Sequence, residues 1–269
     1  MQSMLSRISF IILATTFMMA CSATQATPLA GEVTISKIDG MQLHYVPAGK
    51  FNMGNDNGWA GQKPAHEVDL DAFWIDETEV TTRMYALCVQ AGACLPPQNE
   101  SSYTRERYFI DAQYANYPVI YVSWEDANAY CKWAGRALPS EAQWEKAARG
   151  TDGRLYPWGN QVPEKDLLNN FDVSFLEDTV QVGSYPQGAS PYGALDLSGN
   201  LWEWTADWFT PYPGGDPKAT ENYGQTYRVL RGGSFVDAAN ATTRYANDPD
   251  LKMHDIGFRC LLSVSSDGN

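Results

Sequence analysis

The chain has 269 residues, 44% of them apolar, and a formal net charge of -13. This length and apolar content are enough for one large core or two small domains. The negative charge argues against nucleic acid and against an anionic membrane surface as partners. Nine tryptophans and fifteen tyrosines favour a rigid, aromatic-lined, loop-rich protein over a helical bundle.

Residues 1–20 resemble a bacterial lipoprotein signal peptide. Arg7 supplies positive charge, and the apolar run that follows it is too short to span a membrane well. The run ends at Cys21, the expected lipidation site and first residue of a mature chain that is tethered through residues 21–40. Met18 stands where such signals usually have leucine, so ordinary secretory cleavage is the alternative. Both routes predict an exported protein, and the first predicts a periplasmic or outer-surface lipoprotein that meets the membrane only through its lipid anchor.

Short strands and turns are predicted for the first part of the domain. Residues 33–38 and 43–46 alternate or run apolar, and residues 47–54 form a turn followed by a strand. After a loop rich in glycine and asparagine over residues 55–61, residues 67–76 alternate again. The inward positions of this last strand are expected to be Val68, Leu70, Phe73 and Ile75.

Three helices are predicted next, over residues 81–91, 123–134 and 140–149. Threonine or serine stands at the start of each, where its side chain can cap the helix, and a glycine follows each end. The remaining residues show only loops and short strands, the last of them over residues 256–262. Because no internal linker is visible, we expect one α+β domain over residues 41–265.

The cysteines are informative in an exported protein, because an oxidising compartment favours disulfides. With Cys21 set aside as the lipid site, four cysteines remain and three connectivities are open. Cys88 and Cys94 flank a short turn that allows a local bridge. Cys131 and Cys260 would then close a long loop. A redox-active or metal-binding thiol cluster is the alternative, but the sequence contains no C-x-x-C motif.

Oxygen ligands are concentrated in residues 196–204. Asp196 and Glu203 are hard ligands, and the turn over residues 198–200 exposes backbone carbonyl groups. Calcium prefers this mixture of carboxylate, amide and carbonyl oxygens. Two tryptophans in the same stretch would keep water out. The alternative is a tight turn that enters a buried strand, with Glu203 solvated.

Eight short motifs run in order from about Met41 to the carboxyl end. They are residues 46–54, 79–81, 118–124, 133–145, 156–160, 199–204, 231–235 and 257–260. Together they resemble the formylglycine-generating enzyme family, also called the sulfatase-modifying factor domain. The resemblance implies a C-type-lectin-like α+β fold, irregular, with short strands and a few short helices.

The resemblance also implies two calcium sites. The first uses two side chains and two carbonyl groups, those of Asp196, Glu203, Gly199 and Leu201. The second begins at the side chain of Asn170 and the carbonyl group of Phe171, and its carboxylate is open between Asp172 and Asp178. A disulfide of the family also corresponds to Cys131 and Cys260, the pair that remains when Cys88 and Cys94 are bridged. Structural calcium is therefore the expected cofactor.

The chain departs from the family at the catalytic centre. In the enzyme, two cysteines after a Gly-Gly-Ser turn bind copper and oxidise a substrate cysteine to formylglycine. Here the turn at residues 232–234 is followed by Asp237 and Thr242 at the two cysteine positions. Copper(I) needs soft thiolates, so we expect neither copper nor this activity. The His-x-x-x-His-x-Glu pattern of iron-dependent members is also missing, because the histidines are dispersed at His44, His66 and His254.

Six residues match the neighbourhood of the family's active cleft: Trp202, Ser234, Asp237, Thr242, Arg244 and Tyr245. We expect a ligand or peptide groove, with indole stacking from Trp202 and polar contacts from Ser234 and Asp237. Arg244 could clamp an anion, but we favour its pairing with a neighbouring acid. In the alternative for the other two residues, Ser234 bonds the backbone of its own bend and Asp237 is solvated.

Two functions are open for such a protein. The first is a calcium-stabilised, membrane-tethered binding or regulatory module, with a protein or peptide partner in the cell envelope. The second is an oxidoreductase that uses a different metal or cofactor in the same cleft. The lipid-anchor pattern and the missing thiols favour the first. A serine hydrolase has little support, because Ser234 has no evident histidine base.

Overall fold

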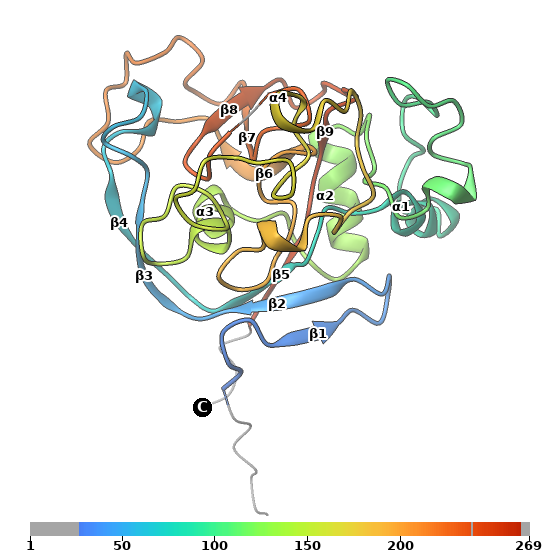
Figure 1. Ribbon diagram of the computed structural model, residues 1–269, viewed down its shortest axis with the longest axis horizontal. Helices are drawn as coiled ribbons and strands as arrows, with labels where there is room; N and C mark the ends of the chain where they lie inside the picture. Colours follow the sequence, from blue (N-terminus) through green and yellow to red (C-terminus); the bar gives the residue numbers. More distant parts are fainter. Residues whose placement is uncertain (1–26, 238, 265–269) are drawn as a thin grey trace, which may run out of the picture.

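Residues 27–237 and 239–264 are described by the computed structural model of the chain, which is shown in Figure 1. The predicted signal peptide and the lipidation site Cys21 lie outside the described residues. Within the described part, no helix is long and apolar enough to cross a membrane. Short helices and short strands alternate with long loops, so the predicted α+β class is confirmed.

The first sheet has four antiparallel strands in the order β1-β2-β5-β10. Their bounds are Val33–Ile35, Gln42–Val46, Phe73–Asp76 and Leu261–Ser263. Ahead of β1, the Gly31 N–H donates to the carbonyl oxygen of Tyr45 at 2.9 Å. The later residues of the predicted tether, which covered residues 21–40, are therefore part of the folded domain.

The second sheet has the order β8-β7-β6-β9 and lies above the first in Figure 1. Its strands are Arg244–Asn247, Arg228–Arg231, Trp202–Trp208 and Ile256–Gly257. β9 runs parallel to β6, and the other pairs are antiparallel. The core lies between this sheet, the first sheet and the helices.

The single strand predicted over residues 67–76 is wrong. The structure has two strands there, β4 (His66–Leu70) and β5 (Phe73–Asp76), in two different sheets. β4 pairs with β3 (Gly49–Met53), whereas β5 pairs with β2. The apolar alternation changes phase between Leu70 and Phe73, which is where the chain leaves one sheet for the other, and the prediction of one strand overlooked this shift.

The three predicted helices are confirmed as α1, α2 and α3, over Thr82–Gln90, Trp124–Trp133 and Glu141–Arg149. Hydroxyl groups cap all three, because Thr81, Ser123 and Ser140 each accept a backbone N–H of the first turn. Four short elements were not predicted: the one-turn helix α4 and the 3-10 turns η1, η2 and η3, over Phe171–Ser174, Ala60–Gln62, Ala112–Tyr114 and Pro186–Gly188.

Both predicted disulfides are present. Cys88 and Cys94 have their Cα atoms 5.3 Å apart, and those of Cys131 and Cys260 are 5.6 Å apart. The second bridge joins α2 to the last part of the chain inside the largest core cluster, where the rings of Tyr85 and Tyr130 stack at 5.7 Å. This bridge closes a loop with a sequence separation of 129, which strongly restricts the unfolded chain.

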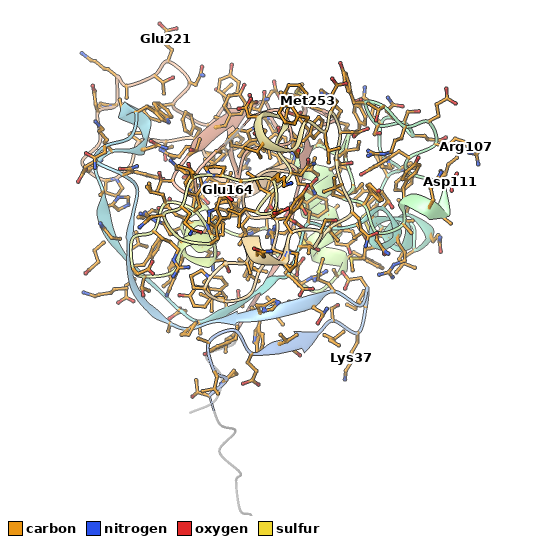
Figure 2. The ribbon with its side chains drawn as sticks, viewed as in Figure 1. Lys37, Arg107, Asp111, Glu164, Glu221 and Met253 are labelled. Atoms are coloured by element: carbon orange, nitrogen blue, oxygen red, sulfur yellow. A yellow bond between two sulfur atoms is a disulfide. The ribbon has the colours of Figure 1, made fainter. Side chains whose placement is uncertain are left out.

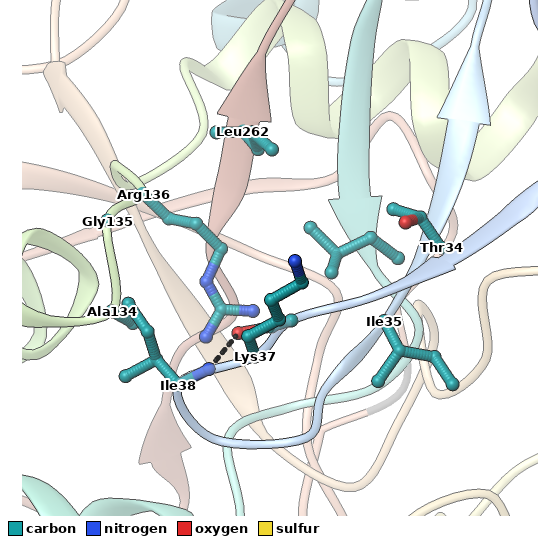
Figure 3. Close-up of a pocket in the computed structure, with 10 residues that line it drawn as sticks. Thr34, Ile35, Lys37, Ile38, Ala134, Gly135, Arg136 and Leu262 are labelled. Carbon is teal, nitrogen blue, oxygen red and sulfur yellow. Dashed lines mark hydrogen bonds between the residues drawn. The ribbon is translucent and has the colours of Figure 1, made fainter.

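An apolar hollow of about 310 Å³ lies where the turn after β1 meets the end of α2 (Figure 3). The Ile38 N–H donates to Ser36 Oγ at 3.3 Å in this turn. Arg136 reaches into the hollow, and its guanidinium group forms ion pairs with Asp39 and Asp76. The positive charge of Arg136 is therefore balanced within the fold.

Candidate functional site

A turn of unusual backbone geometry leads the chain into β6. Asp196, Gly199 and Asn200 have positive φ angles of 57°, 79° and 62°. A Cβ atom on Gly199 would lie 2.4 Å from the carbonyl oxygen of Asn169, so only glycine fits there. The turn buries the Asp196 carboxylate, whose Oδ2 accepts the Gly183 N–H at 2.7 Å.

Glu203 is fully buried on β6 and binds an arginine. Its two oxygens accept hydrogen bonds from Arg259 Nε and Nη2, both at 2.7 Å, and Oε2 also accepts Trp144 Nε1–H at 2.8 Å. The alternative with a solvated Glu203 is therefore wrong. Paired, charge-assisted hydrogen bonds of this kind are strong, so Glu203 acts first as the counter-ion of Arg259.

Negative charge is in excess around this pair, because Glu79 and Asp196 are buried beside Glu203. Glu79 Oε1 accepts Asn200 Nδ2–H at 3.0 Å, but Oε2 is buried and has no partner among the described residues. Burial raises the pKa of Asp196 to about 6, and burial together with the neighbouring carboxylates holds the pKa of Glu79 well above its usual value.

A calcium ion would balance the excess negative charge here and could use the unpartnered Glu79 oxygen, while both oxygens of Glu203 already accept hydrogen bonds. The described residues do not contain a ready group of three histidine, cysteine or acidic side chains that could hold a metal. An ion here would need carbonyl oxygens as well, which is the mixture predicted for Gly199 and Leu201 together with Asp196 and Glu203.

The residues predicted for a second calcium site also make contacts within the fold. The Asn170 side chain caps α4, and its Nδ2 donates to the carbonyl oxygen of Ser234 at 3.1 Å. The Phe171 carbonyl oxygen accepts the Phe175 N–H at 3.0 Å. Asp178 forms an ion pair with Arg105 at 3.0 Å, whereas Asp172 is exposed. A second calcium ion here stays a prediction.

The bend after β7 depends on glycine and on the Ser234 hydroxyl group. Gly233 has a φ of 75°, and a Cβ atom there would lie 2.6 Å from the carbonyl oxygen of Asp237. Ser234 Oγ accepts the N–H groups of Val236 and Asp237 at 3.1 and 3.3 Å. The structure therefore agrees with the alternative in which Ser234 bonds its own bend, and it leaves the Asp237 side chain exposed.

Asp255 links the bend to β6, and sequence reasoning missed it. Ser234 Oγ donates to Asp255 Oδ2 at 3.4 Å, and the Trp202 N–H donates to the Asp255 carbonyl oxygen at 2.9 Å. Asp255 Oδ1 is buried without a partner among the described residues. Burial raises the pKa of the Asp255 carboxyl group, and the charge of Asp237 adds to the effect. A lone acid before a two-residue strand gives no sequence pattern that could have revealed this role.

Only part of the predicted cleft comes together. Trp202 packs on Tyr245 with ring centroids 5.3 Å apart, and the tyrosine, which is 50% exposed, offers the larger free face. Arg244 is 3% exposed and binds Glu141 through two hydrogen bonds of 2.6 and 2.8 Å. Arg244 therefore pairs with an acid, which was the favoured alternative to an anion clamp. Thr242 is fully buried, and its hydroxyl group donates within its own loop.

A pocket of about 430 Å³ opens beside the bend, and we call it the aromatic pocket. Four separate segments line it through Tyr103, Phe171, Glu177, Phe235, Val236 and His254. The rings of Tyr103 and Phe235 pack on His254 with centroids 5.4 and 5.8 Å apart. Tyr103, Phe171 and Val236 are 64%, 42% and 49% exposed. Large apolar side chains gathered on a surface in this way are typical of a binding site.

Thiol chemistry is closed off in the described part of the chain. Each described cysteine belongs to one of the two disulfides. At the two positions that the resemblance assigns to copper-binding cysteines, the structure has an exposed Asp237 and a buried Thr242. The described residues therefore offer no free thiolate beside the bend.

Comparison with known proteins places this geometry in context. Residues 32–264 match the family described as the sulfatase-modifying factor enzyme 1-like domain. The chain is 33% identical over 281 residues to the inactive C-alpha-formylglycine-generating enzyme 2 of Mus musculus, covering 82% of this chain and 85% of the relative. It is 33% identical over 276 residues to the formylglycine-generating enzyme of Streptomyces coelicolor, covering 80% and 87%.

Some relatives are much longer. The chain is 32% identical over 246 residues to the serine/threonine-protein kinase pkn1 of Chlamydia pneumoniae, an alignment that covers 83% of this chain and 38% of the kinase. The chain thus spans less than two fifths of that relative's length.

Two solved structures share the fold. Treponema denticola variable protein 1 and PvdO from Pseudomonas aeruginosa give TM-scores of 0.70 and 0.73, with sequence identities of 23% and 22%. The matches cover 87% and 88% of this chain, and 99% and 100% of those chains. At such identities the likeness shows the fold alone, and it confirms the formylglycine-generating-enzyme fold that the resemblance implied.

Proposed function

Because the chain belongs to the sulfatase-modifying factor family, we propose that it is an exported, lipid-anchored member that binds a partner and has lost formylglycine chemistry. The observation that carries this proposal is the chemistry of the two key positions. Asp237 and Thr242 offer oxygen where copper(I) chemistry needs paired sulfur, and every described cysteine is in a disulfide. A mouse relative at 33% identity is itself named as an inactive enzyme, which supports the same reading.

The binding role is supported by the surface beside the bend. A binding module needs an accessible, partly apolar surface with a few fixed polar groups. The aromatic pocket provides apolar walls, while the exposed Glu177 in the wall and the exposed Asp237 on the adjoining bend provide carboxylate oxygens. The half-exposed ring of Tyr245 extends the surface over Trp202. We expect a protein or peptide of the cell envelope to bind here.

Calcium has a structural role in this proposal. Asp196 and Glu203 would hold the ion together with the carbonyl groups of Gly199 and Leu201. Its charge would balance the buried carboxylates that Arg259 neutralises only in part, including the unpartnered Glu79 oxygen. The two disulfides are in keeping with export, since disulfides persist in oxidising compartments.

The loss of chemistry can be tested on the purified mature protein. Incubation with a cysteine-containing sulfatase peptide, copper and oxygen is expected to leave the peptide unchanged by mass spectrometry. The Streptomyces coelicolor enzyme is the positive control. Elemental analysis of the exported protein should find calcium without stoichiometric copper or iron. Aldehyde formation, or a full equivalent of iron or copper, would overturn the proposal in favour of an oxidoreductase.

The binding role has its own test. The mature domain is used to capture partners from the native envelope, beside a variant that carries Ser234→Ala and Asp237→Ala. The partner should be retained by the wild-type domain and lost at least ~10-fold from the variant, because about 1.4 kcal/mol of polar contact corresponds to that factor. Unchanged thermal unfolding of the variant is the control for its folding. Equal capture by both proteins would contradict binding at the bend.

A further inference from the structure

We propose that the aromatic pocket is a site for an organic ammonium cation, either a free small molecule or a group carried by a larger partner. This inference rests on the proposed binding function and names the ligand class of the same surface. Three properties of the described residues carry it, namely the ring faces in the wall, the acidic groups around the wall, and the neutralisation of nearby basic side chains.

Aromatic side chains make up most of the wall. Tyr103, Phe171, Phe235 and His254 line the pocket from four places in the sequence. A cation positioned over the faces of tyrosine or phenylalanine is attracted by the negative charge on the ring face, and several rings around one cation add up. The Tyr103 ring lies flat against His254, with an interplanar angle of 26°, so packing fixes its orientation in advance.

The charges around the pocket are negative. Glu177 is part of the wall and is exposed. Asp255 follows His254 directly, and its buried Oδ1 has no partner among the described residues. Asp237 is exposed on the adjoining bend. Because neither lysine nor arginine lines the pocket, its field favours a positive ligand, and the net charge of -13 would steer one toward it.

The basic side chains of neighbouring segments are already paired. Arg105, two residues from Tyr103, forms an ion pair with Asp178 at 3.0 Å. Lys252, two residues from His254, forms an ion pair with Asp126 at 2.6 Å. Each of these cations is held by an acid of its own, so neither needs the carboxylates beside the pocket. The exposed carboxylates of Glu177 and Asp237 remain available to a ligand.

The decisive comparison is between choline and 3,3-dimethylbutan-1-ol, which has the same shape but no charge. Each is titrated at pH 8 and low salt into the full-length protein, and its methyl resonance is followed by NMR. Choline should bind about tenfold more tightly than the alcohol, and its methyl signal should move upfield because it lies over ring faces. Added salt should weaken the binding of choline and leave the binding of the alcohol unchanged.

Variants assign the effect to the pocket. Tyr103→Ala should weaken the binding of choline about fivefold, whereas Tyr103→Phe keeps the ring and should bind choline like the wild type. Glu177→Gln should reduce the preference for choline over the alcohol. Glu221→Gln is the matched control, because it removes the same charge from a loop that lies well away from Met253, the neighbour of His254 (Figure 2).

The outcomes separate this inference from the function on which it rests. Equal or tighter binding of the neutral alcohol would overturn the cation site, and so would the absence of any upfield shift with choline. N-acetyl-lysine methylamide, run in parallel, tells a peptide side chain from a free quaternary amine. If both cations fail while envelope capture still depends on Ser234 and Asp237, the binding function survives and the ligand class is wrong.

Discussion

Two regions on either side of β7 treat buried charge in opposite ways. On the side of α3, each buried acid has an arginine, as in the pairs of Glu145 with Arg231 and Glu141 with Arg244 at 2.5 and 2.6 Å. At the bend that follows β7, Asp255 is buried with one oxygen unpartnered among the described residues. The first region behaves as a closed scaffold, and the second resembles a site that awaits a ligand.

The difference has a physical basis. A buried carboxylate without a cation keeps a desolvation cost that the fold does not repay, so such groups are rare away from functional sites. The α3 side offsets this cost internally, because Glu141 and Glu145 each accept two hydrogen bonds from arginine side chains. The bend retains the cost beside an exposed aromatic pocket, where a positive ligand could offset it. The predictions below test this contrast, from the largest expected effect to the smallest.

Breaking the scaffold should cost the most. Glu203→Ala leaves Arg259 buried without its counter-ion, so the free energy of unfolding should fall by about 3–5 kcal/mol. Urea unfolding followed by circular dichroism measures it. Glu67→Gln is the control, because its partner Lys50 is 61% exposed and the pair should contribute nothing measurable. A Glu203 variant as stable as the control would mean that the scaffold does not depend on its ion pairs.

Calcium removal should have an intermediate effect. An ion that binds only the folded state at 100 times its dissociation constant stabilises that state by about 2.7 kcal/mol, so a chelator should lower the melting temperature. Magnesium should not restore it, because the expected ligands include several carbonyl oxygens. Asp196→Asn should make the melting temperature insensitive to the chelator. If the wild-type protein has the same melting temperature with and without the chelator, calcium does not stabilise the fold.

The smallest effect is expected at the bend, where the substitution should raise the stability of the protein instead of lowering it. The pKa of Asp255 is raised in the folded state, so its contribution to stability is greatest at low pH and is lost as pH rises through that pKa. Asp255→Asn removes this loss. The variant should therefore be as stable as the wild type near pH 4 and slightly more stable at pH 8, by thermal unfolding. A variant less stable at pH 8 would show that the carboxylate is satisfied after all.

Local patterns in the sequence predicted the helices and the disulfide between Cys88 and Cys94, whereas the second disulfide was the remaining pair and was implied by the resemblance. A hydroxyl cap and a trailing glycine define α3 within its own residues, and Cys88 lies close to Cys94 along the chain. The glycine bend was also visible, because close backbone approach at Gly233 requires glycine. These features depend on short stretches whose chemistry can be read without knowing the fold.

Long-range pairing was beyond such patterns. Pairing of Arg244 with an acid was favoured, but the acid is Glu141 on α3, and nothing near Arg244 in the sequence identifies that partner. The aromatic pocket was missed for the same reason, since Tyr103 meets His254 only in the folded chain. The resemblance to the family predicted the fold and showed that the two copper-binding cysteines are replaced, whereas the charge balance around Asp255 became visible only in the structure.

The placement of the chain ends carries one more consequence. The described chain starts beneath β1, and its last strand, β10, belongs to the same sheet, while α4 lies at the opposite end of the molecule (Figure 1). A domain that hangs from a lipid at its amino end would hold the mouth of the pocket outward, facing the surrounding space. Ligands could then reach the pocket without obstruction by the bilayer.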